Sequence, residues 1–327
     1  MTSGGTTSRA GGIAGIVRSA LLFLLLLFTL DYGIGSSLCR FYFRQSSGEQ
    51  YRTTYSMERT TAGILVFGTS RANHHYVPSV FEEGLGDDFY NAGRDGSSIL
   101  YHYAVLAGVL ARHTPRAVVL DITPAEFARS RAPYERLTAL LPYYDTHPEV
   151  RPVVLLKSRF ERLKLLSRIY PFNSSLLTIA MGNLEANRKR KPDIKGYIPL
   201  RGRWGGPPGK AELAADETID PALVRHFARF LVEARARGIR LHVVVSPAYR
   251  EPGPPSRSLR IAGEICEKHG AAFSDFTSSA CFFDRSDLFQ DPYHLNHEGA
   301  VLFSERIVEE ILRERGSAGG EEPRDGR

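Results

Sequence analysis

One serine and one Asp-His pair have the residue types that nucleophilic catalysis needs, although they lie far apart in the chain. Ser70 follows the apolar run 64–67 and Gly68. A continuous apolar run predicts a buried parallel strand, and open α/β sheets keep their ligand sites at the carboxyl ends of such strands. His294 supplies a base, and Asp291 supplies a carboxylate that can orient it. These residues predict a serine nucleophile activated by a histidine.

The elements that must position these residues follow from the hydrophobic pattern. Buried strands are predicted at 64–67, 89–91, 117–121, 239–247 and 271–276. Helices are predicted between them, one of them from Asp220-Pro221 to Gly238, and a last helix begins near Asn296. Strands that alternate with helices are typical of a parallel sheet. Ser70 is then expected at the end of the first strand, and Asp291 and His294 in the loop before the last helix.

The alternation breaks at about 124–216, which we interpret as an insertion. Its helical segments end at Pro142 and run through 153–166, and basic runs follow at 188–191 and 201–203. Two interpretations stay open. The insertion is a solvated, charged lid, or its cations and aromatic residues, such as Tyr197 and Trp204, contact a glycan or an anionic headgroup.

The N-terminal region predicts a membrane anchor. Residues 1–12 are a polar tail, and the apolar core 20–30 is by itself shorter than the ~20 residues that a bilayer needs. With Arg18 and Asp31-Tyr32 at its ends, a segment over 13–36 becomes long enough to cross. No small-x-small cleavage site follows the core, so an uncleaved anchor is favoured over a signal peptide. Residues 37–61 are expected to form a stalk to an exported domain, and 316–327 a second disordered tail.

Composition restricts the partners. The chain has 327 residues, a net charge of +6 and a pI near 9.2, which suits an anionic partner, but it carries no nucleic-acid motif. Cys39, Cys266 and Cys281 give neither a disulfide framework nor metal-ligand spacing, and a single Cys266–Cys281 bridge stays open. The adjacent His74 and His75 point in different directions and lack a carboxylate at ligand spacing. We therefore expect no metal, no cofactor and no nucleic acid.

With these motifs in place, the chain resembles the SGNH/GDSL-type hydrolases, in a membrane-anchored bacterial branch associated with polysaccharide modification. Gly68-Thr69-Ser70 matches the first motif of that family, Asn91-Ala92-Gly93 the second, and Asp291 to His294 the last. Thr69 stands where the family usually has Asp, and residues 118–123 lack the Asn of the third motif. The resemblance implies a flavodoxin-like, three-layer α/β fold with a parallel central sheet over 62–315, preceded by one transmembrane helix.

The resemblance also implies a division of labour among the site residues. The catalytic residues are Ser70, His294 and Asp291, and the amides of Ser70 and Gly93 hold the oxyanion. With the third-motif Asn missing, a third donor is either absent or comes from elsewhere, and Asn73 and Arg71 are the candidates. The expected substrate-binding residues are Arg71, His74, His75 and Asn91.

Acyl-ester chemistry is what such a site performs, through an acyl-serine intermediate. Water as acceptor gives an esterase, whereas a sugar hydroxyl gives an O-acyltransferase, which would need an acyl-donor protein in the membrane. The anchor and the basic insertion favour a cell-envelope glycan, with the chain in the bacterial inner membrane by a single pass and its catalytic domain facing the periplasm or exterior. Because the third-motif Asn is missing, a catalytically silent, membrane-tethered glycan-binding component of a polysaccharide assembly or export complex remains the alternative.

Overall fold

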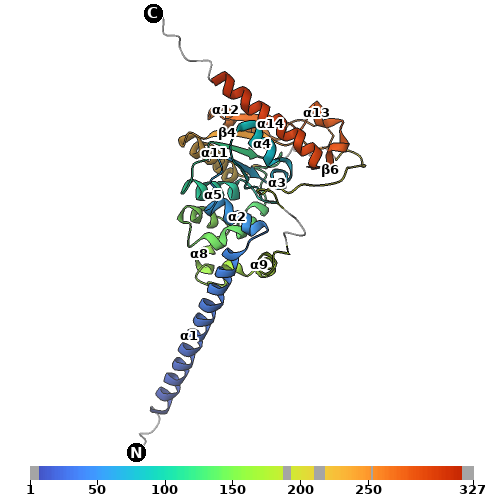
Figure 1. Ribbon diagram of the computed structural model, residues 1–327. Helices are drawn as coiled ribbons and strands as arrows, with labels where there is room; N and C mark the ends of the chain where they lie inside the picture. The colour runs from blue at the N-terminus through green and yellow to red at the C-terminus, as the bar shows by residue number, and fades with distance from the viewer. Residues whose placement is uncertain (1–6, 187–192, 210–217, 252, 319–327) are drawn as a thin grey trace, which may run out of the picture.

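The computed structural model describes residues 7–186, 193–209, 218–251 and 253–318. At its centre lies a five-stranded sheet in the order β2–β1–β3–β4–β5, in which every neighbouring pair is parallel (Figure 1). The strands are β1 Ile64–Gly68, β2 Phe89–Asn91, β3 Ala117–Asp121, β4 Arg240–Val245 and β5 Ala272–Asp275. This order is that of flavodoxin-like sheets, with the switch point between β1 and β3. The predicted fold class is confirmed.

Helices cover both faces of the sheet and make the fold three-layered. Alternate residues of β1 enter different cores: Ile64 and Val66 pack on one side, and Leu65 and Phe67 on the other. The first side is covered by α3 Ser70–His75, α4 Pro78–Leu85 and α14 His297–Ala318, and the second by α5 Ile99–Leu110, α11 Pro221–Ala236 and α12 Arg257–Lys268. Both faces of β1 are buried, which is why its sequence is continuously apolar.

The helix ends follow from the residues at them. The Asp220 carboxylate accepts a hydrogen bond from the Ala222 amide and caps α11, and Gly238, at φ 70°, lies just beyond its end. The last helix, α14, buries Ala300, Phe303 and Ile307 along one stripe. Its described part runs to Ala318, somewhat past the start of the expected tail.

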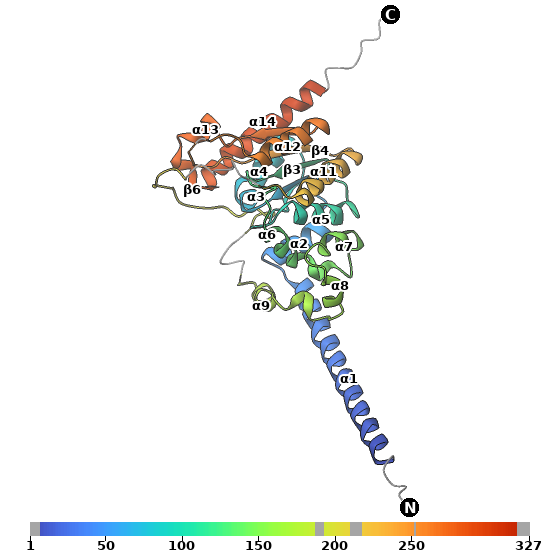
Figure 2. The same ribbon diagram turned by 180° about the vertical axis from the view of Figure 1, so that it is seen from behind.

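A 38-residue helix, α1 Thr7–Arg44, precedes the domain and projects from it in both views (Figures 1 and 2). It is long and apolar enough to cross a membrane, and its apolar window is not buried against the rest of the protein. The following residues correct the expectation of a stalk over 37–61. Tyr42, at the end of α1, is buried, and α2 Glu49–Glu58 buries Arg52 and Met57 against the domain. This polar stretch is therefore helical and packs its buried side chains against the domain, and it is not an extended tether.

The insertion between β3 and α11 is built from short pieces: α6 Ala132–Glu135, η1 Arg136–Tyr143, η2 Pro148–Val150, α7 Arg151–Val154, α8 Glu161–Lys164, η3 Tyr170–Phe172 and α9 Leu176–Asn183. The helix predicted over 153–166 is therefore two four-residue helices. The basic run 188–191 lies outside the described residues. At the other end of the chain, α13 Ala280–Phe283 and η4 Ser286–Leu288 lead to a two-stranded hairpin, β6 Phe289–Asp291 and β7 His294–Leu295. The thiols of Cys266 and Cys281 are unpaired, the first buried and the second exposed.

Candidate active site

The end of β1 is shaped by Gly68, which turns the chain toward Ser70. Gly68 has φ 148°, and a Cβ added there would lie 2.6 Å from the Asp121 carbonyl oxygen of β3 and 2.9 Å from the Ala72 Cβ. A side chain at this position is therefore excluded by both conformation and space. Helix α3 starts directly afterwards with Ser70, which is partly exposed while the rest of α3 is buried. The turn presents one hydroxyl at the carboxyl edge of the sheet.

The Asp-His pair lies on a tight hairpin rather than in the open loop that the sequence predicts. Asp291 ends β6 and His294 begins β7, with Pro292 and Tyr293 between them. One oxygen of Asp291, Oδ1, accepts hydrogen bonds from the amides of Tyr293 (2.8 Å) and His294 (3.0 Å). An Asp that accepts from the amides two and three residues later, followed by Pro, is a preferred way to build such a turn. The carboxylate thus fixes the hairpin and stands beside the imidazole at the same time.

The hairpin and α3 bring the three predicted catalytic side chains into one hydrogen-bonded row. His294 Nδ1 lies 2.9 Å from Asp291 Oδ2, and His294 Nε2 lies 2.8 Å from Ser70 Oγ. A carboxylate can only accept, so Nδ1 carries the proton and Nε2 is left to accept from the serine hydroxyl. This is the tautomer that a general base needs.

Two further imidazoles pack around His294. The rings of His74 and His75 lie 5.6 Å and 6.2 Å from it, both close to perpendicular. Burial lowers the pKa of His74 and lowers that of His75 well below its usual value, so both are neutral near pH 7. They confine the His294 ring without placing a positive charge beside it.

His74 and His75 have internal partners, which differs from the expectation that they contact substrate. The Nδ1 atom of His74 donates to the Ile198 carbonyl at 2.7 Å, and the His75 Nε2 atom accepts from the Leu295 amide at 3.0 Å. His75 is fully buried. It joins α3 to β7, the strand that carries His294, and is better described as a positioning residue.

The two predicted oxyanion donors differ. Ser70 is the first residue of α3, so no carbonyl one turn earlier in the helix accepts its amide hydrogen. The Gly93 amide, in contrast, donates to Asn91 Oδ1 at 2.9 Å. Asn91 is fully buried, and its Nδ2 donates to the Ala72 carbonyl at 2.6 Å. Asn91 therefore ties β2 to α3 and occupies the Gly93 amide. The sequence predicts instead that Asn91 binds substrate.

The remaining predicted residues are also engaged inside the protein. Arg71 is buried under the site, where it donates to the Ile122 carbonyl at 3.0 Å and lies 4.0 Å from Asp121 Oδ1. Asn73 is buried as well. Its side-chain Nδ2 donates to Asp95 Oδ1, and its Oδ1 accepts from Arg52 at 3.1 Å. Neither side chain reaches the surface, so the expected roles of Arg71 in substrate binding and of Asn73 as an oxyanion donor are not supported by this geometry.

Asp121 supports the site from below. Its carboxylate accepts from Tyr76 at 2.8 Å and from Ser246, and burial, opposed by the charge of Arg71, raises its pKa. These contacts link β3 and β4 to the segment that carries α3.

The insertion acts as a scaffold behind α3. The Asn73 carbonyl accepts from the Ile198 amide at 2.8 Å, and the Asn91 amide donates to the Lys195 carbonyl at 2.9 Å. Tyr197, expected to contact a glycan, is buried, and its hydroxyl lies 2.9 Å from His297 Nδ1. This stretch joins α3 and β2 to the start of α14.

The next part of the insertion holds the hairpin. The Trp204 amide donates to the Phe289 carbonyl at 2.7 Å, and Asn296 Nδ2 donates to the Gly202 carbonyl at 2.9 Å. Tyr249, after β4, donates its amide to the Pro292 carbonyl in the turn itself, at 2.9 Å. The segment of the chain that breaks the sequence pattern thus helps to set the distance between His294 and Ser70.

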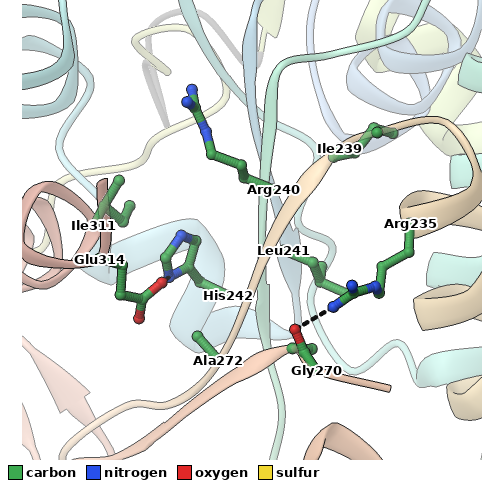
Figure 3. Close-up of a pocket in the computed structure, with 11 residues that line it drawn as sticks. Arg235, Ile239, Arg240, Leu241, His242, Gly270, Ala272, Ile311 and Glu314 are labelled. Atoms are coloured by element: carbon green, nitrogen blue, oxygen red, sulfur yellow. Dashed lines mark hydrogen bonds and ion pairs between the residues drawn. The ribbon is translucent and has the colours of Figure 1, made fainter. Parts of the chain in front are cut away.

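The largest of the cavities described here lies away from this site. It measures about 650 Å³ and lies at the amino ends of β4 and β5, opposite the edge that carries Ser70 (Figure 3). Arg235, Arg240, His242 and Glu314 contribute its polar lining. Ser70 and His294 line none of the cavities described, and the side chains of His294 and Asp291 are 24% and 39% exposed. Among the described residues, no cluster of His, Cys, Asp and Glu is arranged to hold a metal ion.

Three solved structures are similar to this chain at low identity. The psychrotrophic esterase EstA from Pseudoalteromonas sp., inhibited by monoethylphosphonate, is 11% identical with a TM-score of 0.39, covering 77% of this chain and 98% of its own. A family two carbohydrate esterase from Clostridium thermocellum is also 11% identical with a TM-score of 0.39, over 77% of this chain and 64% of that one. The acetyl xylan esterase AlAXEase is 11% identical with a TM-score of 0.36, over 76% and 98%. No protein-family model and no curated protein matches the chain.

The strand order and the position of the triad define the class of protein. The sheet is flavodoxin-like, Ser70 stands at its switch point, and the Asp-His pair precedes the last helix, so the SGNH/GDSL-like fold implied by the sequence is confirmed. At 11% identity and these TM-scores, the three esterases carry no chemistry over to this chain. Its chemistry has to be argued from its own residues.

Sequence reasoning missed the residues that hold the site together. Arg52 lies in the expected stalk, and yet it donates to Asn73 Oδ1 and, at 2.9 Å, to the Gly196 carbonyl. The sequence signal that could have revealed them is the recurrence of Arg, Thr and Met at helical spacing in 49–58, because this spacing predicts an amphipathic helix with a buried face.

Proposed function

We propose that the chain is a serine-dependent acyl-ester hydrolase or O-acyltransferase that acts on a cell-envelope glycan. The observation that carries the proposal is the unbroken row from Ser70 Oγ through His294 to Asp291, with distances of 2.8 Å and 2.9 Å. A partly exposed hydroxyl at one end and an oriented carboxylate at the other are what acyl transfer requires.

The reaction proceeds in two stages. Ser70 Oγ attacks the ester carbonyl carbon while its proton passes to His294 Nε2, and Asp291 stabilises the imidazolium that forms. The Ser70 amide donates to the oxyanion, and one such donor is typically worth about 3 kcal/mol of barrier. Collapse of the tetrahedral intermediate expels the alcohol, which takes the proton from Nε2 and leaves an acyl-serine. Water or a sugar hydroxyl then attacks the acyl carbon by the same path in reverse.

The second oxyanion donor distinguishes this proposal from its alternative. The Gly93 amide has to leave Asn91 Oδ1, or share its hydrogen, before it can bind an oxyanion. A permanently occupied Gly93 amide favours a catalytically silent, membrane-tethered glycan-binding component of a polysaccharide assembly or export complex. We favour the enzyme because a binding platform has no use for a hydrogen-bonded Ser-His-Asp row.

The proposed location follows from α1. Its core is exposed and apolar, and its C-terminal end continues into the buried Tyr42, so helix and domain form one unit. We infer a single pass through a bacterial inner membrane, with the domain on the periplasmic or outer side. An envelope glycan is the polymeric substrate available there, and an acyl-donor protein in the membrane becomes the partner if the acceptor is a sugar hydroxyl.

Labelling by a fluorophosphonate tests the proposal most directly, because the probe phosphonylates an activated serine. We expect the detergent-solubilised full chain to be labelled at Ser70, and the Ser70→Ala variant to stay unlabelled. An aryl acetate, offered with and without an oligosaccharide, then separates the reactions. Acetate released into water indicates an esterase, and acetylated sugar an acyltransferase.

Two outcomes would overturn parts of the proposal. A folded chain that neither reacts with the probe nor turns over the ester supports the silent glycan-binding alternative. Labelling that persists in Ser70→Ala identifies a different nucleophile.

A further inference from the structure

Seven large apolar side chains are exposed on one part of the insertion. Outside α1, most of the exposed large hydrophobic residues among those described lie between residues 156 and 184. They are Leu156, Phe160, Leu163, Leu166, Leu176, Leu177 and Leu184, and we call this set the apolar collar. Leu166, Leu177 and Leu184 are 75%, 75% and 77% exposed, which is unusual for leucine in a soluble surface.

The apolar collar surrounds the point at which α1 enters the domain. Helices α8 and α9 lie on opposite sides of α1 in both views (Figures 1 and 2). Between them, the Asp31 carboxylate of α1 accepts hydrogen bonds from the Ser167 hydroxyl and from the amides of Arg168 and Ile169. On the α9 side, Asn183 Nδ2 donates to the Phe41 carbonyl at 2.9 Å. Helix α9 is thus held at Phe41, ten residues farther along α1, and the turn 167–169 beside Leu166 is held at the height of Asp31.

That height coincides with the end of the apolar stretch of α1. Residues 13–30 contain Arg18 as their only charged residue and, as helix, span roughly 27 Å, close to the thickness of a bilayer's hydrocarbon core. Asp31 follows immediately. When this stretch spans a membrane, Asp31 and the turn 167–169 bound to it lie at the boundary with the headgroups, and Leu163 and Leu166 lie within a few residues of that turn.

Cations accompany the apolar side chains. Arg159, Arg162, Lys164 and Arg168 are exposed in the same segment, with Arg159 over the Phe160 ring at 4.6 Å and Arg168 over Tyr32 at 5.1 Å. Leucine and phenylalanine interleaved with Lys and Arg are typical of surfaces that lie in the interface of an anionic bilayer.

We propose that the apolar collar is a second membrane contact, which docks the domain against the lipid surface around α1. The occupant is the bilayer, rather than a partner protein or a second copy of this chain, because the collar is continuous with the only described helix that can span a membrane. The inference rests on α1 being an anchor and is independent of the reaction at Ser70. Docking holds the domain in one orientation instead of letting it swing on a tether.

Fluorescence quenching by lipid tests the docking. The chain has one tryptophan, so Trp204→Phe gives a background in which Leu166→Trp places a single tryptophan on the collar. The matched control is Val232→Trp, an exposed apolar position on α11, and that helix lies farther from α1 than α8 does in both views. Each full chain is reconstituted into phosphatidylcholine and phosphatidylglycerol vesicles, with and without bromine on the acyl chains. We expect the brominated lipid to remove most of the emission of the Leu166→Trp chain and to leave that of the Val232→Trp chain unchanged.

The outcomes separate docking from anchoring. A Leu166→Trp chain that floats with the vesicles but is not quenched overturns the docking while the anchor stands. A chain that does not float overturns both. Circular dichroism checks the Trp204→Phe background, and if that background is unfolded, the same two substitutions are compared in the native chain by the change in emission. Leu163→Trp, which lies within a few residues of the turn 167–169, is a second probe and should behave as Leu166→Trp does.

Discussion

Two histidine–carboxylate pairs lie at opposite ends of the sheet, and only one stands beside a serine. At the amino end, His242 Nδ1 of β4 lies 3.4 Å from Glu314 Oε2 of α14, beside the cavity of about 650 Å³ (Figure 3). At the carboxyl end, His294 Nδ1 lies 2.9 Å from Asp291 Oδ2, and both side chains are partly exposed. The His242 pair lies beside a cavity large enough for a ligand. The residues that line this cavity include no Ser, Thr or Cys that could act as a nucleophile.

This difference favours the position in the fold over the size of the cavity as the guide to where the proposed chemistry lies. His242 lies within a strand, and pairing with β3 and β5 fixes its backbone. Its partners on those two strands, Val119 and Ala272, are apolar. His294 is on a hairpin beyond the sheet, where a turn can bring in Asp291 and face α3. In open parallel sheets, ligand sites lie at the carboxyl ends of the strands, where loops can bring side chains next to the residue that ends a strand.

Removing the nucleophile should have the largest effect. Ser70→Ala should abolish ester turnover, and adding His294→Ala should cost little more, because both residues serve one proton-transfer path. The rates of the two single variants and the double variant toward an aryl acetate check this. Losses that multiply would mean that Ser70 and His294 act independently, and the row of hydrogen bonds would then have no catalytic meaning.

Asp291→Asn should have the next largest effect. The amide can donate to Nδ1, which favours the tautomer with the proton on Nε2, so we expect a loss of about 10³- to 10⁴-fold in kcat. Glu314→Gln, the same change in the other pair, should leave kcat as it is. Because Asp291 also fixes the hairpin, a thermal-unfolding measurement must accompany the rates. Equal effects of the two substitutions would contradict the distinction between the pairs.

His242→Gln should have the smallest effect and should act on stability alone. We expect the free energy of unfolding to fall by about 1 kcal/mol, as is usual for a substitution that disturbs a buried polar contact. Ester turnover should be unchanged. A large loss of turnover with normal stability would show that the cavity at the amino end takes part in the reaction.

The sequence by itself predicted the strands and the candidate triad. The continuously apolar run 64–67 predicts a strand buried on both faces, and a serine two residues after Gly68 is then expected at the carboxyl edge of a parallel sheet. Asp291 and His294 are close in sequence, so their pairing needed only a local turn. Local periodicity and short spacing carry this information because they depend on neighbours along the chain.

Only the tertiary structure decided which of the other polar residues face the site. Arg71, His75 and Asn91 are within a few residues of Ser70 or Gly93, and the sequence could not show that their partners would be Ile122, Leu295 and Ala72. The same is true of residues 37–61 and of Tyr197, whose buried contacts come from distant segments. Burial of a polar side chain is decided by where its hydrogen-bond partner lies in space, and for these residues the partner is far away in sequence.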